Sequence, residues 1–248
     1  MIYAGYFAGE FGWLLMRWQA KVRFLSELNG DIIVGCEKQY NFLFEDFTSK
    51  FMAFEDLNIE IKSRNMWLCN QQIYPMAEKC FSPDRQKCID NNNQSFIKYG
   101  VKSERKYDIL LHDRSTKNFN TEYRNWNCDK WLDIVSHFKG LKVASVGSKS
   151  GANYIKDTED LRSIELKSLA NIMASSRVLV SPSSGTAHFA SLCGLPHIVW
   201  SDRIDRGLYD NKQRYETDWN PFNTKCNFID SWHPDSKTVI KEIEKCIL

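Results

Sequence analysis

Short apolar runs alternate with amphipathic stretches along most of the chain. The first apolar run lies at 2–7. It leads into 13–28, where Leu14, Trp18 and Val22 recur at the spacing of one helix face. The pattern therefore predicts a strand followed by a helix at the start of the chain.

The same alternation continues to the end of the sequence. It predicts strands at 31–36, 58–62, 107–113, 141–147, 177–183 and 196–202, and helices at 128–138, 167–176, 185–193 and from 235 onward. Strands that alternate with helices are typical of α/β proteins with parallel sheets. A polar stretch near 98–106 predicts a linker between an N-terminal domain, 1–105, and a C-terminal domain, 106–248. We expect two Rossmann-like domains whose parallel sheets face a cleft.

Composition narrows the class of protein. The chain is 43% hydrophobic and 26% charged, as in water-soluble globular proteins. Its charges nearly balance, with 33 Lys and Arg against 31 Asp and Glu, and this balance does not favour a broad surface for binding nucleic acid. Neither a transmembrane run nor a signal peptide is recognisable, so we expect a cytoplasmic protein, with peripheral membrane contact left open. The eight cysteines include no Cys-x-x-Cys pair. Their spacing indicates reduced thiols and predicts no metal site.

The stretch 178–200 reads VLVSPSSGTAHFASLCGLPHIVW and joins a strand to a helix of small residues. Helix N-termini in parallel α/β sheets favour anions, because their first N–H groups are free and the helix dipole is positive there. Gly185 allows close approach to the backbone, and His188 adds a donor or a partial charge one turn later. The hydroxyl donors are Ser183, Ser184 and Thr186. The pattern predicts a phosphate site, and it equally fits a plain turn with a serine N-cap and a core histidine.

This segment resembles the ADP-heptose:lipopolysaccharide heptosyltransferases, glycosyltransferase family 9. That family carries Ser-x-Asp-Ser/Thr-Gly-x-x-His-x-Ala and then Gly-x-Pro. Here 181–190 reads SPSSGTAHFA and 194–196 reads GLP. Three further stretches are similar and occur in the family's order, namely YRNWNCDKW at 123–131, KVASVGSKSGANYI at 142–155 and DLRSIELKSLANIMASSRVLVS at 160–181.

The resemblance implies a GT-B fold and an inverting, metal-independent glycosyltransferase with no cofactor. Its donor would be a nucleotide-diphosphate sugar, and its acceptor a glycan or a lipid-linked hydroxyl. The diphosphate would meet the helix at Gly185 and His188, and Arg124 would neutralise charge on the leaving nucleotide. The chain has no Asp-x-Asp pair of the kind that holds a divalent ion on a diphosphate.

Two positions depart from the family pattern. Ser183 stands where the family usually has Asp, and Trp13 stands where the first loop usually has the Asp that is the candidate base. Inverting transfer needs a base within reach of the incoming hydroxyl. Glu10 is the nearby acid, so we predict it as the catalytic base. Its alternative role is a carboxylate that complements a helix dipole.

Three other polar residues follow predicted strands of the C-terminal domain. Arg114 is a candidate second phosphate contact. Lys149 and Asn153 are candidate nucleoside contacts, with an exposed loop as the alternative.

Two other functions stay open at this point. One is polysaccharide pyruvyl transfer, in which Arg124 and His188 would bind the single phosphate of phosphoenolpyruvate. The other is a catalytically inactive nucleotide-sugar-binding protein, which the missing Asp at 13 and 183 keeps in view.

Overall fold

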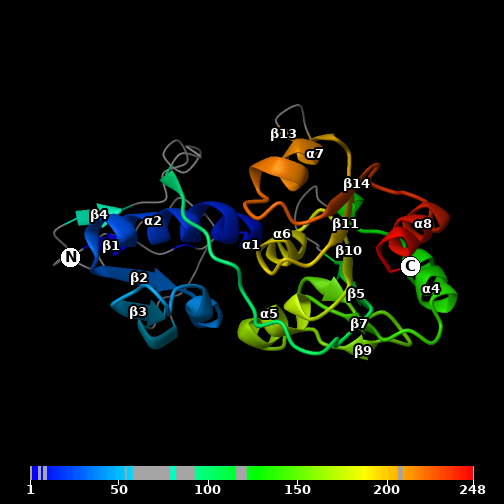
Figure 1. The fold of residues 1–248 in the computed structure, drawn as a ribbon, viewed down its shortest axis with the longest axis horizontal. Helices are drawn as coiled ribbons and strands as arrows, with labels where there is room; N and C mark the ends of the chain where they lie inside the picture. Colours follow the sequence, from blue (N-terminus) through cyan, green and yellow to red (C-terminus); the bar gives the residue numbers. More distant parts are fainter. Residues whose placement is uncertain are drawn as a thin grey trace. The chain divides into compact units, whose positions relative to one another are not determined.

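The computed structural model describes residues 2–4, 7, 10–53, 55–57, 79–81, 93–115, 122–205 and 209–247 (Figure 1). The chain divides into two compact units, Met1–Ile97 and Lys98–Leu248. This division falls at the start of the linker predicted at 98–106. The two units are described separately.

The first unit contains a parallel four-stranded sheet in the order β3-β2-β1-β4. Its strands are β1 (Ile2–Ala4), β2 (Ile32–Cys36), β3 (Lys50–Ala53) and β4 (Lys79–Phe81). β1 and β2 confirm two predicted strands, and β2 is buried along its whole length. The strand predicted at 58–62 lies outside the described residues.

A continuous helical run follows the first strand and confirms the predicted helix. It comprises α1 (Phe11–Trp13), the π-helical turn η1 (Leu14–Gln19) and α2 (Ala20–Asn29). Leu14, Trp18 and Val22 are fully buried, as their spacing predicted. α2 ends at Gly30, whose φ of 75° is in the left-handed region that glycine adopts without strain.

The second unit contains a parallel six-stranded sheet in the order β14-β11-β10-β5-β7-β9. Its strands are β5 (Ile109–Leu111), β7 (Val143–Ser145), β9 (Glu159–Asp160), β10 (Val178–Pro182), β11 (His197–Ser201) and β14 (Cys226–Asp230). Counted along the chain within this sheet, the order is 6-5-4-1-2-3, that of a Rossmann fold. The direction of winding reverses between β5 and β10.

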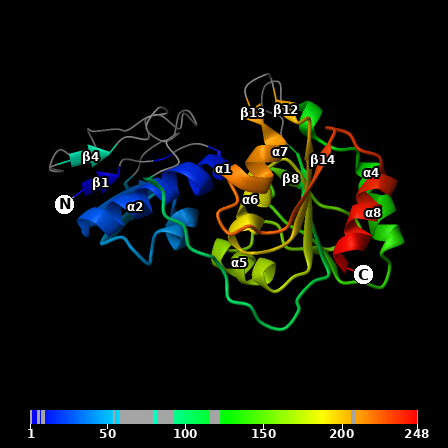
Figure 2. The same cartoon turned by 45° about the horizontal axis from the view of Figure 1, so that its top comes forward.

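Helices cover both faces of this sheet (Figure 2). α4 (Cys128–His137) packs against α8 (Ser236–Ile247) on one face, and α5 (Leu166–Ala174) packs against α6 (Gly185–Leu192) on the other. The usual right-handed crossover accounts for α4 on one face and for α5 and α6 on the other, because the connection through α4 and those through α5 and α6 run in opposite directions across the sheet. All four helices were predicted from the sequence.

The core beneath α4 and α8 is built around three tryptophans. The ring centroid of Trp126 lies 4.8 Å from that of Trp131 and 4.9 Å from that of Trp200. Ile134 and Val239 complete this side of the core. These indoles bury a large apolar area and fix α4 on the sheet.

Several elements were not predicted. β14 closes one edge of the sheet, and before it come α7 (Asn211–Gln213) and the π-helical turn η7 (Arg214–Asp218). A short antiparallel ribbon pairs β6 (Asp113–Arg114) with β8 (Ala152–Asn153). Each is short or half-exposed, so none has a strong apolar period.

Within the described part of the chain, free thiols are found at Cys36, Cys128, Cys193, Cys226 and Cys246. Within the described ranges, no helix combines the length and the apolar character needed to cross a bilayer.

Two neighbouring residues of α4 test the position of the core. Trp131 is 1% exposed and Leu132 is 40% exposed. Trp131→Ala should lower the free energy of unfolding by about 3–5 kcal/mol, because it removes a large side chain from a packed core. Leu132→Ala should cost less than about 1 kcal/mol. Urea denaturation measures both values, and equal losses would contradict this packing.

Candidate functional site

The candidate site lies where the winding of the second sheet reverses. Ligands of open α/β sheets bind at the carboxyl ends of strands beside such a reversal. His112 follows β5 and Ser183 follows β10 at this edge. The two strand ends are joined by a hydrogen bond from the His112 N–H to the Val180 carbonyl at 3.0 Å.

The N-terminus of α6 lies at this edge of the sheet, because the helix follows β10 directly. Ser184 is the N-cap, and its Oγ accepts a 3.4 Å hydrogen bond from the N–H of Ala187. The predicted serine N-cap is therefore present. The N–H groups of Gly185 and Thr186 lie in the first turn of α6 and have no acceptor within the helix, so they are donors for a ligand or water. The cap and an anion site are compatible, because they use different donors.

Ser183 and Ser184 are held by a residue that the sequence did not single out. The Tyr215 hydroxyl accepts a hydrogen bond from the Ser184 N–H at 2.9 Å and lies 3.0 Å from Ser183 Oγ. Ser181 Oγ lies 3.0 Å from Ser184 Oγ. Tyr215 is 31 residues farther along the chain than Ser184, in a turn without strong periodicity, so no local signal points to it.

His188 lies inside α6, one turn from its start, and is 4% exposed. Its ring stacks on Tyr215 at 4.3 Å with a 3° interplanar angle, and Trp219 contacts it edge-on at 4.7 Å. Burial lowers the pKa of His188 well below its ordinary value, and the charge of Arg214 adds to this. His188 is therefore neutral at pH 7 and can offer a hydrogen bond, not a positive charge. Its Nδ1 has no hydrogen-bond partner among the described atoms.

His112 is a second buried histidine at this edge of the sheet. Its Nδ1 lies 3.1 Å from the Val146 carbonyl, and burial lowers its pKa to about 4. Gly147 passes close beneath the ring with a φ of 118°. A Cβ there would lie 2.6 Å from His112 Nδ1, so this position requires glycine. His112 thus serves the packing of the β5 and β7 ends.

The β6–β8 ribbon carries two of the predicted ligand-binding residues. Asn153 donates from Nδ2 to Asp113 Oδ2 at 3.1 Å, and Arg114 donates from Nη1 to Asn125 Oδ1 at 3.0 Å. Burial raises the pKa of Asp113, and the amide of Asn153 opposes this rise. β6 packs against β10, so Arg114 belongs to the same edge as the start of α6.

Arg124 is the last residue of the short 3₁₀ helix η6 (Glu122–Arg124), and Lys149 lies in a turn that follows β7. The Arg124 guanidinium stacks 5.0 Å from the ring centroid of Trp232, and its Nε donates to Tyr123 Oη at 3.3 Å. Lys149 is exposed, and its backbone N–H donates to Ser163 Oγ at 2.8 Å.

Glu10 belongs to the first unit and is the N-cap residue of α1. Its backbone is extended, its side chain is exposed, and it makes no capping hydrogen bond. The carboxylate is therefore not consumed by helix capping. Trp13, at the position of the family Asp, is the last residue of α1 and half-buried.

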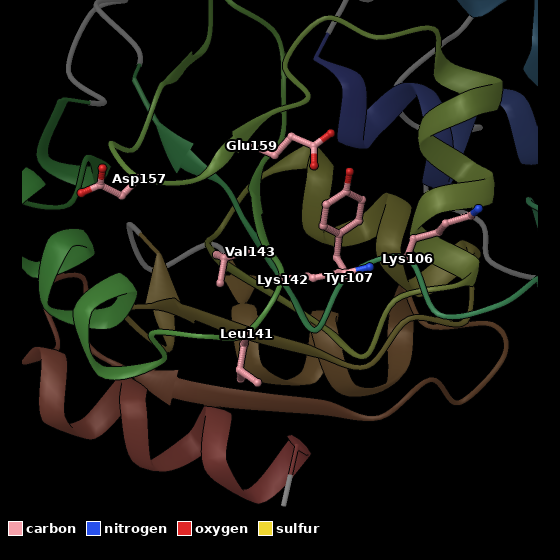
Figure 3. Close-up of a pocket in the computed structure, with 7 residues that line it drawn as sticks. All are labelled: Lys106, Tyr107, Leu141, Lys142, Val143, Asp157 and Glu159. Carbon is pink, nitrogen blue, oxygen red and sulfur yellow. The ribbon is translucent and has the colours of Figure 1, made fainter.

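A cavity of about 470 Å³ lies at the opposite edge of the second sheet (Figure 3). It is lined by Lys106, Tyr107, Leu141, Lys142, Val143, Asp157 and Glu159. Burial and the neighbouring Glu159 raise the pKa of Tyr107 to about 12. These residues precede or begin strands, so the cavity is distinct from the carboxyl-end site. Among the described residues, no three His, Cys, Asp or Glu side chains gather as metal ligands.

Comparison with known proteins finds relatives by fold. No protein-family model and no curated protein sequence matches the chain significantly. A glycosyl transferase family 9 protein from Veillonella parvula matches with a TM-score of 0.55 and 10% identity, over 100% of this chain and 90% of that chain. E. coli heptosyltransferase WaaC with ADP gives 0.56 and 10%, over 99% of each chain. E. coli ADP-heptose lps heptosyltransferase II gives 0.57 and 10%, over 99% and 97%.

At this identity the likeness establishes the fold. The mixed α/β architecture with a large parallel sheet matches these GT-B structures, so the fold predicted from the family 9 resemblance is confirmed. A cleft between two facing sheets stays a prediction. These three structural neighbours are glycosyltransferases, but the function of this chain has to be argued from its own site.

The buried histidines make stability depend on pH. Burial lowers the pKa of His112 and of His197 to about 4 from an ordinary value of 6.5, and it lowers the pKa of His188 well below that ordinary value. Below pH 6.5 the histidines bind protons in the unfolded chain but stay neutral in the folded chain. Each histidine therefore adds to the free energy of unfolding above pH 6.5, and this contribution is lost as the pH falls toward 4. The loss should be on the order of 1 kcal/mol per histidine between pH 6.5 and 5.

Urea denaturation at several pH values measures this dependence. His197→Asn should weaken this pH dependence by about one histidine's share, because it removes one buried ring whose pKa is lowered. An unchanged pH dependence in His197→Asn would contradict the neutral, buried state of that ring.

Proposed function

We propose that the protein is a glycosyltransferase that moves a sugar from a nucleotide-diphosphate sugar to a hydroxyl of a glycan or lipid-linked acceptor, with inversion and without a metal. The observation that carries this proposal is the start of α6. It places free N–H donors and serine hydroxyls at the reversal of a parallel sheet in Rossmann order. That combination is suited to a diphosphate.

The diphosphate would be bound by Ser183, Ser184, Gly185 and Thr186. The helix dipole and the first amides of α6 favour the charge that develops as the sugar leaves. Arg114, on the ribbon that packs against β10, would supply a positive charge. Arg124 is the second candidate cation, and Lys149 and Asn153 would contact the nucleoside.

His188 would take part as a neutral group. Its burial excludes a positive charge at pH 7, so it would hydrogen-bond to a phosphate oxygen or fix the helix start. The positive charge that offsets the leaving group would then come from arginine and from backbone dipoles.

The chemistry would be a direct displacement at the anomeric carbon. The acceptor oxygen forms a bond to this carbon while the bond from carbon to phosphate oxygen breaks, and that electron pair leaves with the nucleoside diphosphate. Glu10 would take the proton of the acceptor hydroxyl. Its exposed carboxylate, free of a capping bond, supports this role. We place the reaction in the cytoplasm, in keeping with free cysteine thiols.

Ligand-induced thermal stabilisation tests the donor site. ADP, GDP, UDP, CMP and phosphoenolpyruvate are compared with and without EDTA. One nucleoside diphosphate at about 100 times its dissociation constant should add about 2.7 kcal/mol of stability in the presence of EDTA. In Gly185→Asp, this shift should vanish through charge repulsion. Without ligand the variant should be no less stable, because an acidic residue suits a helix N-terminus.

Each of the other outcomes would contradict a different part of this proposal. Stabilisation by phosphoenolpyruvate alone would indicate pyruvyl transfer, and loss of binding in EDTA would contradict metal independence. If no compound stabilises the protein, the donor site is refuted.

Replacement of Glu10 tests the base. Glu10→Gln should lower the turnover number by about 10²–10⁴-fold and leave donor affinity unchanged, because general-base catalysis contributes that much to a rate. The matched control is Glu27→Gln, an exposed carboxylate of α2. Steady-state kinetics with a saturating acceptor measure both variants. Unimpaired turnover in Glu10→Gln would exclude Glu10 as the base.

A further inference from the structure

The turn η7 is fastened to α6 at two points. At its start, Tyr215 is 2% exposed and reaches the residues that precede the helix. Beyond its end, Asn220 Oδ1 accepts a hydrogen bond from Ser191 Oγ at 2.9 Å, and Thr224 Oγ1 donates to the Ser191 carbonyl at 2.8 Å. Buried polar groups that are mutually satisfied in this way rigidify a structure. The Tyr215 hydroxyl is therefore held in a fixed place relative to α6.

The distances around the Tyr215 hydroxyl indicate which groups donate to it and which group accepts its proton. The hydroxyl accepts from the Ser184 N–H at 2.9 Å, so its own proton is available for donation. The candidate acceptors are Ser183 Oγ at 3.0 Å and the Ser184 carbonyl at 3.4 Å. Ser183 Oγ is the nearer. Burial raises the pKa of Tyr215 to about 12, so the hydroxyl keeps this proton at neutral pH.

A serine that accepts from tyrosine has its own proton free. A hydroxyl carries one donor and two acceptor lone pairs. When Ser183 Oγ accepts the proton of Tyr215, the Ser183 O–H can be donated to an anion at the start of α6. The Ser184 N–H is already satisfied by Tyr215, so an anion would use the next amides, those of Gly185 and Thr186.

We propose that Tyr215 is a positioning residue of the anion site: its hydroxyl directs the Ser183 O–H and the first amides of α6 toward a bound diphosphate. The stacked rings of Tyr215 and His188, 4.3 Å apart, keep the hydroxyl in register with the helix. Tyr215 acts through Ser183 and Ser184 and does not itself touch the ligand. This inference rests on the proposed function and adds a residue to the same site.

A double-mutant cycle tests the proposal. Dissociation constants for pyrophosphate and ADP are measured by calorimetry for the wild type, Tyr215→Phe, Ser183→Ala and the double variant. Each single variant should weaken both probes about tenfold, as expected for one hydrogen bond to a charged group. The double variant should bind no more weakly than either single variant, because Tyr215 and Ser183 act as one unit. Tyr107→Phe, at the opposite edge of the sheet, should bind like the wild type.

The results separate the role of Tyr215 from the existence of the donor site. Wild-type affinity in Tyr215→Phe, or losses that add in the double variant, would overturn the role of Tyr215 and leave the donor site intact. If the wild type binds neither probe, the donor site is refuted and the positioning role with it.

A measurement on the wild type covers the case in which Tyr215→Phe does not fold. In nuclear magnetic resonance, the Ser184 amide should be protected from exchange before any ligand is added. Pyrophosphate should change the amide shifts of Gly185 and Thr186. A Ser184 amide that becomes protected only with pyrophosphate would overturn the proposal, since Tyr215 would then not occupy it.

Discussion

The account depends on the backbone N–H groups at the start of α6. A helix leaves its first amides without internal acceptors, and buried or half-buried donors have to be satisfied by side chains, water or ligand. Here Ser184 caps the Ala187 N–H with a long bond of 3.4 Å, and Tyr215 takes the Ser184 N–H at 2.9 Å. The reversal of the sheet between β5 and β10 determines where the remaining donors lie, at the edge where parallel sheets bind ligands.

Burial determines which groups near these donors can carry charge. His188 and His112 are both packed at this edge with lowered pKa values, so neither can balance a phosphate electrostatically at pH 7. Tyr215 keeps its proton for the same reason. The proposed site therefore combines neutral hydrogen-bonding groups with Arg114, on the strand β6 that packs against β10. Fixed dipoles in such a setting stabilise developing negative charge without reorganisation.

The sequence predicted the central part of the second unit because strong apolar runs define it. β10 and β11 are buried along their whole length, and the small-residue helix between them begins at the predicted serine cap. β14 was missed because its residues are mostly half-exposed and lack a continuous apolar run.

Tyr215 could not be found in the sequence, because its contacts with Ser183 and Ser184 join residues about 31 positions apart and arise only from the packing of η7 on α6. His188 was recognised, but its neutrality follows from rings that stack on it from η7 and beyond. Glu10 was found as the acid at a helix start, and its position as N-cap of α1 agrees with that pattern, while its role as base stays a prediction.

The most direct measurement is a crystal structure of the protein grown with ADP and EDTA. The account predicts the diphosphate at the start of α6, within hydrogen-bond distance of the Gly185 and Thr186 amides and of Ser183 Oγ. The second unit also offers a cavity at the amino ends of its strands, where Lys106 and Lys142 could attract an anion. A diphosphate bound in that cavity, with the start of α6 occupied by water alone, would contradict the account.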